Sequence, residues 1–199
     1  MKELVVATRN EKKFEEIKDL LQDISVDISW LREYPQVPKC VESGSSFYDN
    51  ALIKAETAAK YLNEKMCLGE DSGLCVDFLD GAPGIYSARF AGGDGWDKGN
   101  NQKMLNALKD LPQEKRTASY VCRMVLLDGG EIIANIEERC EGWIDFEAKG
   151  SFGFGYDPIF VVPEYGKTFA QLGPAVKRKI SHRSKATRKL AKYLKGYLE

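Results

Sequence analysis

Hydrophobic residues recur along the first part of the chain with the spacings of alternating strands and helices. Leu4 to Thr8 is a short β-branched run, and apolar residues then return at helical spacing from Phe14 to Ile24. Residues 25–30 alternate between polar and apolar side chains, as a half-buried strand does. A second helix is expected to begin near Ser45 or Ser46. This part of the chain is therefore predicted to be strand, helix, strand, helix.

The rest of the pattern predicts a hairpin and further helices. Asp-Gly-Gly separates two long β-prone runs, which is a strong hairpin signal. The apolar run at residues 66–68 predicts a strand that ends at the acidic pair Glu70 and Asp71, before a Ser-Gly turn. The other expected elements, in order, are a helix around Asn101 to Leu108, strands at Ala118 to Leu127, Glu131 to Glu138, Cys140 to Ile144 and Ile159 to Val162, and an amphipathic helix from Ser184 onward.

Strands separated by helices at the start and an antiparallel hairpin later predict a mixed α/β fold with helices covering a central sheet. The chain has 199 residues, of which 43% are hydrophobic and 30% charged. It can therefore bury one substantial core, and we expect a single domain over residues 1–199. The net charge of −1 argues against wholesale nucleic-acid binding.

Cysteine usage and hydropathy indicate the cellular compartment. The five cysteines are odd in number and form no CxxC pair, so we expect buried reduced thiols rather than disulfides or a zinc site. No apolar segment approaches the roughly 18 residues that a membrane span needs, and the chain enters a strand-like run without a signal peptide. These features predict a cytoplasmic protein without a membrane partner.

Acidic residues in the first half of the chain form a candidate cation site. Glu70 and Asp71 stand together at the expected strand end, and Glu42 lies in the loop before the second helix. Mg²⁺ typically takes one or two protein carboxylates and leaves its other positions to water and substrate phosphate. Lys54, which shares a helix face with Asn50, would supply charge opposite these acids. An exposed loop carboxylate is the simpler interpretation of each acid alone, and only their joint occurrence favours a metal site.

Thr8, Asn10 and Lys13 follow the first strand, where it leads into a helix. Free backbone N–H groups and the helix dipole favour an anion at such a position, and phosphate is the natural one. The alternative is that Thr8 or Asn10 only caps the helix and that Lys13 is a solvated surface charge. The chain contains no GxxxxGK[ST] segment, so this is not a Walker A loop.

A glycine-framed aromatic loop, GSFGFGYDP, occupies residues 150–158. Phe154 and Tyr156 place aromatic faces beside the hydrogen-bonding acid Asp157, which suits a stacked purine. The alternative is an aromatic plug that fills the core. The glycines favour a binding role because they let the backbone approach a ligand closely.

Lys177, His182 and Arg183 form a cationic cluster around the only histidine of the chain. A catalytic serine triad is not indicated, because no GxSxG segment accompanies the histidine. A structural histidine beside a solvated basic run is one alternative, and contact with nucleic-acid phosphates is another. Because the overall charge is balanced, we favour a compact site for a small polyanion.

Five motifs together resemble the inosine triphosphate pyrophosphatase family, which removes non-standard purine nucleoside triphosphates. They read ATRNEKKFEEI, VESGSSFYDNALIKA, EDSGLCVDFLDGAPGIYSARFAG, FGFGYDPIF and KRKISHR, in the order that the family shows. The resemblance implies an elongated mixed β-sheet flanked by helices, two lobes with a central cleft, and a homodimer. Three positions depart from the family pattern: Glu70, where many relatives carry Asp; Val41, where an acid is frequent; and Arg9, where Gly is common.

The resemblance also implies roles for individual residues. Asp71 would be the general base and, with Glu42, would hold Mg²⁺, while Lys54 would be a catalytic contact to the phosphates. Glu70 is left as a possible ligand only. The implied substrate-binding residues are Thr8, Asn10 and Lys13 for the triphosphate, Ser72 for a substrate oxygen, and Phe154, Gly155, Tyr156, Asp157, Lys177, His182 and Arg183 for the nucleobase side.

The activity implied by the resemblance is a magnesium-dependent hydrolysis of ITP, dITP and XTP between the α and β phosphates. It would release the monophosphate and pyrophosphate and so cleanse the nucleotide pool. One alternative is a house-cleaning pyrophosphatase of the Maf type, acting on modified pyrimidine or other nucleotides. The other is a non-enzymatic nucleotide sensor, which would bind ITP without releasing pyrophosphate.

Overall fold

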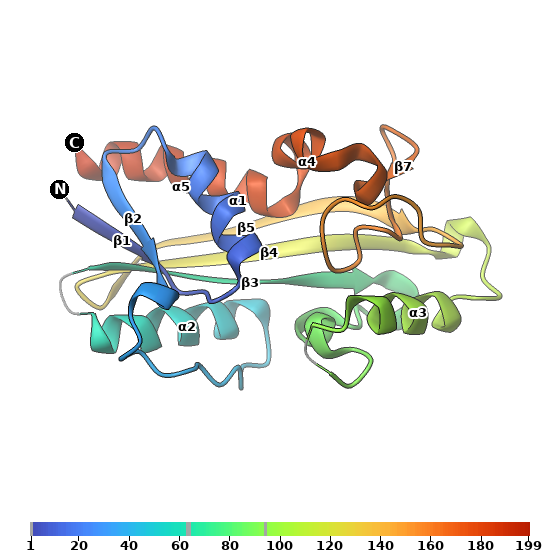
Figure 1. Cartoon of the computed structure of the whole chain (residues 1–199), viewed down its shortest axis with the longest axis horizontal. Helices are drawn as coiled ribbons and strands as arrows, with labels where there is room; N and C mark the ends of the chain where they lie inside the picture. Colours follow the sequence, from blue (N-terminus) through green and yellow to red (C-terminus); the bar gives the residue numbers. More distant parts are fainter. Residues whose placement is uncertain (1, 63–64, 94) are drawn as a thin grey trace. The chain divides into compact units, whose positions relative to one another are not determined.

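A computed structural model describes residues 2–62, 65–93 and 95–199 of the chain. Within these residues, a seven-stranded sheet has the order β2-β1-β3-β4-β5-β6-β7 and carries helices on both faces (Figure 1). β1 pairs in parallel with β2 and β3, whereas β6 pairs antiparallel with β5 and β7, which confirms the predicted mixed α/β class. The strands are β1 (Lys2–Val6), β2 (Val26–Trp30), β3 (Met66–Val76), β4 (Thr117–Asp128), β5 (Glu131–Ile144), β6 (Phe160–Val162) and β7 (Lys167–Thr168).

The helices of the described residues comprise longer α-helices and short 3₁₀ turns. The α-helices are α1 (Glu11–Leu21), α2 (Phe47–Tyr61), α3 (Asp97–Ala107), α4 (Phe169–Ile180) and α5 (His182–Leu198). The 3₁₀ turns are η1 (Leu31–Glu33), η2 (Asp77–Leu79), η3 (Gly84–Arg89) and η4 (Gln113–Lys115).

The chain divides into two compact units. Unit 1 consists of Met1–Asp71, Cys122–Glu138 and Arg183–Glu199, and unit 2 consists of Ser72–Val121 and Arg139–His182. The boundaries fall within β3, β4 and β5, so each of these strands contributes residues to both units. The expected site residues are likewise distributed over the two units.

In unit 1, α1 and α5 cover one face of the strands and α2 covers the other (Figure 1). Phe14 of α1 and Leu190 of α5 belong to one buried cluster with Leu4 of β1. Ala55 of α2 belongs to a separate buried cluster with Val125 of β4. The apolar stripes read from the sequence are therefore the surfaces that bury these helices against the sheet.

In unit 2, α3 and α4 lie on opposite faces of the strands (Figure 1). Met104 of α3 and Phe169 of α4 belong to one buried cluster, together with Tyr120 of β4 and Phe160 of β6. Tyr156, from the glycine-framed loop, is part of the same cluster. This loop is therefore anchored in the core of unit 2.

The predicted end of the third strand at Glu70 and Asp71 is wrong. β3 continues through both acids and through the predicted Ser-Gly turn to Val76. Within the sheet, β3 lies between β1 and β4, and pairing with neighbouring strands overrides the local turn preference of Ser72 and Gly73. The acidic pair therefore lies within a strand and not in a loop.

Other elements also differ from the prediction. Residues 140–144 are not a further strand, because β5 runs unbroken from Glu131 to Ile144. α3 begins at Asp97, four residues before the predicted start. α4 was not predicted; Gly173, with φ 77°, and Pro174 kink it, and this pair interrupts the helical pattern in the sequence.

The five cysteines, all within the described residues, are thiols outside any disulfide, as the sequence predicted, but only three of them are buried as expected. Cys67, Cys122 and Cys140 are buried, and the other two are partly exposed. No helix in the described part of the chain is both long and apolar enough to cross a membrane.

Candidate active site

The turn between β1 and α1 carries the predicted anion-binding residues. Asn10 is the N-cap of α1, since its side-chain oxygen accepts a hydrogen bond from the backbone N–H of Lys13 at 3.2 Å. Thr8 instead accepts from the backbone N–H of Asn10 at 3.1 Å, which decides between the two capping alternatives. Lys13 turns its ammonium toward β3 and contacts Glu70 Oε2 at 2.8 Å. It is therefore part of a polar network and not a solvated charge.

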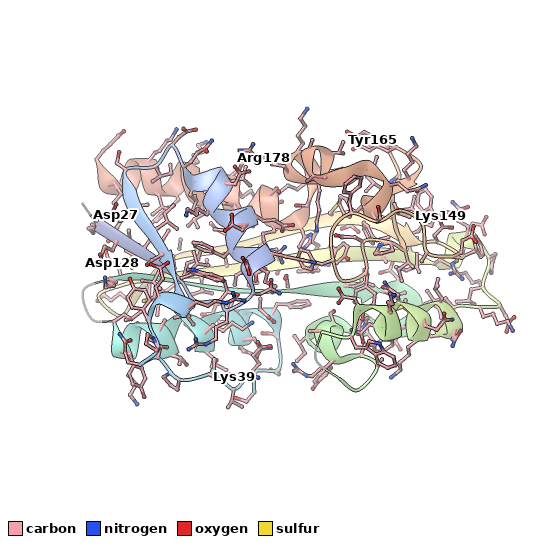
Figure 2. The ribbon with its side chains drawn as sticks, in the orientation of Figure 1. Asp27, Lys39, Asp128, Lys149, Tyr165 and Arg178 are labelled. Atoms are coloured by element: carbon pink, nitrogen blue, oxygen red, sulfur yellow. The ribbon has the colours of Figure 1, made fainter. Side chains whose placement is uncertain are left out.

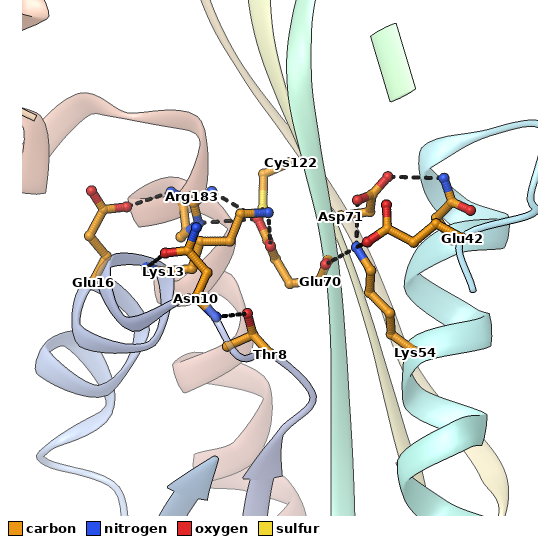
Figure 3. A network of polar contacts seen from close by, with 11 residues as sticks. Thr8, Asn10, Lys13, Glu16, Glu42, Lys54, Glu70, Asp71, Cys122 and Arg183 are labelled. Carbon is orange, nitrogen blue, oxygen red and sulfur yellow. Dashed lines mark hydrogen bonds and ion pairs between the residues drawn. The ribbon is translucent and has the colours of Figure 1, made fainter. Parts of the chain in front are cut away.

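Glu70 is the centre of that network (Figure 3). Its Oε1 atom accepts hydrogen bonds from Arg183 Nε at 3.1 Å and Nη2 at 3.0 Å, while Lys13 contacts Oε2. Arg183 also contacts Glu16 of α1. The Glu70 side chain is 1% exposed, and although burial would raise the pKa of its carboxyl, the charges of Arg183 and Lys13 hold that pKa well below its usual value. Glu70 is thus a buried, ionised carboxylate.

Glu70 and Asp71 point to opposite faces of β3 (Figure 3). Successive side chains of a strand alternate between its faces, so this arrangement follows directly from the continuation of β3 through both residues. Glu70 contacts α1 and α5, whereas Asp71 contacts α2. The two acids therefore do not form the joint cation site that their adjacency in the sequence suggested.

Asp71 faces Lys54 and Glu42 instead. Lys54 Nζ lies 2.6 Å from Asp71 Oδ1 and 3.0 Å from Glu42 Oε1, so one ammonium joins both carboxylates. Asn50 Nδ2 lies 3.4 Å from Asp71 Oδ2. Burial raises the pKa of Asp71 although the Lys54 charge opposes this shift. Burial would lower the pKa of Lys54, but the charges of Asp71 and Glu42 raise it.

Gly69 brings α2 close enough to β3 for these contacts. A Cβ atom at this position would lie 1.8 Å from the carbonyl oxygen of Ala51, which is backbone and cannot yield. Any residue other than glycine would therefore push the helix away from the strand. Because residue 69 is glycine, α2 lies close to β3. Asn50 and Lys54 share a face of α2, so the Asn50 amide and the Lys54 ammonium both reach Asp71.

The Glu42 and Asp71 carboxylates fit a magnesium ion. Both already converge on one cation, the Lys54 ammonium. The described residues contain no group of three or more His, Cys, Asp or Glu side chains that could hold a metal. Two carboxylates are what Mg²⁺ uses when phosphate and water complete its coordination, so the donor set suits this ion rather than a fully protein-ligated metal.

The glycine-framed loop of unit 2 is organised around Asp157. Asp157 Oδ2 accepts from the backbone N–H of Phe154 at 2.9 Å and from Lys177 Nζ at 2.7 Å, and Tyr120 OH lies 3.4 Å from Oδ1. A Cβ atom at Gly153 would lie 2.0 Å from Asp157 Oδ2, so the loop closes over this carboxylate only with glycine there. Asp157 is therefore a buried anchor that joins the loop to α4 and β4.

Two of the three aromatic residues of the loop, Tyr156 and Phe154, have different positions. Tyr156 is buried in the core and donates from its hydroxyl to the carbonyl of Ser87 at 2.9 Å, which fits the interpretation as a core plug. Phe154 is half-buried and carries the Lys177 ammonium 4.2 Å from its ring centre. Phe154 is thus the ring that remains suited to stacking on a base.

The predicted cluster of Lys177, His182 and Arg183 is divided in the structure. Lys177 is buried against Asp157, and the His182 ring stacks on Tyr120 with a centroid distance of 4.7 Å, both in unit 2. Arg183 belongs to unit 1 and to the Glu70 network. The basic run is not wholly solvated either, since Arg178, labelled in Figure 2, is exposed but its neighbour Lys177 is buried.

The predicted site residues thus gather in two groups, one in each unit. The group of unit 1 consists of Thr8, Asn10, Lys13, Glu42, Lys54, Asp71 and Arg183. The group of unit 2 consists of Phe154, Gly155, Tyr156, Asp157, Lys177 and His182, and Ser72, half-buried and next to Asp71 in β3, also belongs to unit 2.

Sequence reasoning missed several residues that support these groups. Glu16 of α1 and Tyr120 of β4 were not singled out, and no motif marks either of them. Asn50 was noted only for sharing a helix face with Lys54, although this spacing is the signal that both reach Asp71. Asp97 and Asn101 of α3 were missed as well, and both bind the loop at Gly155.

Comparisons with known proteins agree on one family. A model of the Ham1 family matches residues 4–193. Proteins named dITP/XTP pyrophosphatase from Shouchella clausii and Bacillus subtilis are each 43% identical over 196 residues, covering 98% of this chain and 98% of the relative. A HAM1 protein from Coxiella burnetii has a TM-score of 0.89 at 39% identity, and the Ham1 protein of Staphylococcus aureus has 0.88 at 38%. Each of these alignments covers 98% of this chain and 100% of the solved chain.

Proposed function

The chain belongs to the Ham1 family, and on this premise we propose that it hydrolyses the non-standard purine nucleoside triphosphates ITP, dITP and XTP to the monophosphate and pyrophosphate. The names of its full-length relatives support this substrate class. The structural observation that carries the proposal is the convergence of Glu42 and Asp71 on the Lys54 ammonium, within one unit with Lys13. This is an arrangement of carboxylates and cations suited to a metal-bound polyphosphate.

In this proposal Glu42 and Asp71 hold Mg²⁺. When bound, the ion would neutralise phosphate charge and make the phosphorus more open to attack. Lys54 and Lys13 bind phosphate oxygens and stabilise the negative charge that collects on the departing pyrophosphate. The N-terminus of α1, with Thr8 and Asn10 before it, orients the triphosphate through its backbone N–H groups.

Asp71 accepts the proton of the attacking water. In the metal-free protein burial raises the pKa of Asp71, so its carboxylate is a stronger base than an ordinary aspartate. Glu70 is a weaker base, because the charges of Arg183 and Lys13 hold the pKa of its carboxyl well below its usual value despite burial. The proton therefore goes to the Asp71 carboxylate in the proposed reaction.

Base selectivity in the proposed reaction comes from unit 2. Hypoxanthine and xanthine present a 6-keto oxygen, to which His182 donates a hydrogen bond while Phe154 stacks on the ring. Adenine presents an amino donor at that position, so ATP would leave the histidine donor unpaired. The resemblance also places Arg183 on the nucleobase side, but its guanidinium is bound by Glu70 and Glu16, so we assign the contact to His182.

We also propose that the protein is a homodimer, as the family resemblance implies, and that it is cytoplasmic and needs neither nucleic acid nor a membrane, as its charge, cysteine usage and hydropathy predict. Sedimentation equilibrium of the purified chain tests the oligomeric state. A mass of one protomer at micromolar concentration would rule out the dimer.

A coupled pyrophosphate assay with a substrate panel tests the activity. Purified protein with Mg²⁺ is expected to release pyrophosphate from ITP, dITP and XTP at least tenfold more efficiently than from ATP. Binding of ITP without release of pyrophosphate would indicate a sensor. Preference for dUTP or dTTP would indicate a pyrophosphatase of the Maf type.

A further inference from the structure

Two side chains of α3 bind both backbone polar groups of Gly155. Asp97 Oδ2 accepts a hydrogen bond from the Gly155 N–H at 2.8 Å, and Asn101 Nδ2 donates to the Gly155 carbonyl at 3.1 Å. Asp97 and Asn101 are four residues apart, so they lie on one face of the helix, one turn from each other. All three residues belong to unit 2. We call this pair of contacts the α3 clamp.

The clamp acts at the middle of the base-recognition loop. Gly155 has a φ of 63° and stands between Phe154, which is proposed to stack on the base, and the buried pair Tyr156 and Asp157. Fixing both the N–H and the carbonyl of one residue fixes the planes of the peptides on either side of it. The direction in which the Phe154 ring leaves the backbone therefore depends on the clamp.

The other contacts of the loop do not replace the clamp. Asp157 binds the Phe154 N–H and Lys177, and the Tyr156 hydroxyl donates to the Ser87 carbonyl. These contacts hold the residues on either side of Gly155. The Asp157 N–H also donates to the Phe154 carbonyl at 3.3 Å and so helps to orient the peptide that carries the Gly155 N–H, whereas the Gly155 carbonyl is bound by Asn101. Burial and the Asp97 charge both raise the pKa of the Tyr156 hydroxyl.

Asn101 holds this position at an energetic cost. It is 8% exposed, and its Oδ1 atom has no hydrogen-bond partner within the described part of the chain. A buried acceptor without a partner is destabilising, and an apolar residue would avoid that cost. A residue that serves only to pack α3 would not need this amide. Within the described residues, the side-chain amide of Asn101 donates to the Gly155 carbonyl.

We propose that Asp97 and Asn101 are positioning residues for base selectivity, acting through Gly155 and not by touching the base. This inference rests on the proposed function, because it assumes that the loop reads the purine. It predicts that weakening the clamp changes the discrimination between ITP and ATP, while the phosphate and metal residues of unit 1 keep their arrangement.

A pair of isosteric variants tests the clamp. Asn101→Asp removes the donor and sets a carboxylate against the Gly155 carbonyl, so the ratio of kcat/KM for ITP over ATP is expected to fall about tenfold, mainly through a higher KM for ITP. Asp97→Asn keeps a side-chain oxygen that can accept from the Gly155 N–H, so its ratio is expected to stay within about twofold of the wild type. Asp97→Ala removes that acceptor and is expected to behave like Asn101→Asp.

Asn106→Asp is the matched control for Asn101→Asp, because it makes the same change at an exposed position of the same helix. The ratio of kcat/KM for ITP over ATP in this control is expected to equal that of the wild type. Amide exchange of residues 150–158, followed by mass spectrometry, reports the loop directly and should quicken in Asn101→Asp and Asp97→Ala alone. This readout does not depend on turnover.

The outcomes separate this inference from the proposed function. If the wild type favours ITP and a folded Asn101→Asp variant favours it equally, the clamp has no role in selectivity and the inference is wrong. If Asn101→Asp lowers turnover of ITP and ATP by the same factor, the contact is only structural, and the inference is again wrong. A wild type that releases no pyrophosphate from any purine triphosphate overturns the proposed function and this inference with it.

Discussion

On the two faces of β3, neighbouring carboxylates lie in different electrostatic environments, and their pKa values shift in opposite directions. On the face toward α1 and α5, Glu70 meets two cations, Lys13 and Arg183, and its pKa lies well below the usual value despite its burial. On the face toward α2, Asp71 shares the single ammonium of Lys54 with a second carboxylate, and burial raises its pKa. The number of cations available to each buried acid therefore decides whether it is a fixed charge or can accept a proton.

The largest expected effect concerns the acid that can accept a proton. Asp71→Asn is expected to lower kcat for ITP by at least about a hundredfold, because the amide cannot take up the proton of the attacking water. Stability in urea should be nearly unchanged, since the variant removes a buried charge. Asp110→Asn, an exposed change in the loop after α3, is the control. Turnover close to that of the wild type would exclude Asp71 as the base.

Glu70→Gln tests the ion-pair network on the face of β3 toward α1 and α5. The variant leaves Lys13 and Arg183 without their shared counter-charge, so the free energy of unfolding at pH 7 is expected to fall by about 3 kcal/mol. Urea denaturation measures this loss, with Glu56→Gln, an exposed change on α2, as the control. A variant as stable as the wild type would show that the Glu70 network is not structural.

The pH dependence of this loss has a defined sign. Because the folded-state pKa of Glu70 is depressed, its stabilisation is fully present above the unfolded pKa of about 4.3 and is lost as the pH falls through the folded value. The difference between wild type and Glu70→Gln should therefore shrink below about pH 4. Denaturation curves at pH 7 and pH 3 measure it. A difference that grows on acidification would contradict the assigned charge state.

Lys54→Met is expected to have a smaller effect on catalysis than Asp71→Asn. Removing one charged contact to the phosphates should lower kcat/KM for ITP about tenfold. The Glu42 and Asp71 carboxylates then lose their shared ammonium, so Mn²⁺, used as a probe for Mg²⁺, should bind the substrate-free variant more tightly than the wild type. Calorimetric titration measures this, with the exposed Lys60→Met of α2 as the control. Unchanged Mn²⁺ affinity would contradict the metal assignment.

The smallest expected effect is a displacement of the pH profile. The acid limb of the pH profile of kcat/KM reports the pKa of the general base in the free enzyme. Because burial raises the pKa of Asp71, the midpoint of this limb is expected above the usual aspartate pKa of about 3.9. The Lys54 charge favours the ionised form of Asp71, so Lys54→Met should move that midpoint to higher pH. Initial rates between pH 4 and pH 8 measure both midpoints. A displacement to lower pH in the variant would contradict the coupling of the two residues.

Much of the fold, and part of the geometry of the candidate site, was predictable from the sequence. Hydrophobic spacing located α1, α2, α5 and the β4–β5 hairpin, and the motifs pointed to the family that the Ham1 model then confirmed. The spacing of Asn50 and Lys54 predicted a shared face, and both side chains reach Asp71. These features were accessible because each depends on local periodicity or on a contiguous motif.

The features that were not predictable depend on tertiary pairing. The opposite directions of Glu70 and Asp71 follow from sheet neighbours that keep β3 extended through a Ser-Gly pair. His182 and Arg183 are adjacent in the sequence, yet one stacks on Tyr120 and the other binds Glu70, because consecutive residues of a helix point in different directions. Adjacency in the sequence was therefore a poor guide to shared function in both pairs.

Site-resolved titration of Glu70 and Asp71 tests the central comparison most directly. The side-chain carboxyl carbons of labelled, substrate-free protein can be followed by NMR as the pH is changed, with Glu70→Gln and Asp71→Asn used to assign the two signals. Asp71 is expected to titrate above about 3.9 and Glu70 below about 4.3. Titration in the opposite sense, with Glu70 raised and Asp71 lowered, would exchange their assigned roles and contradict the account.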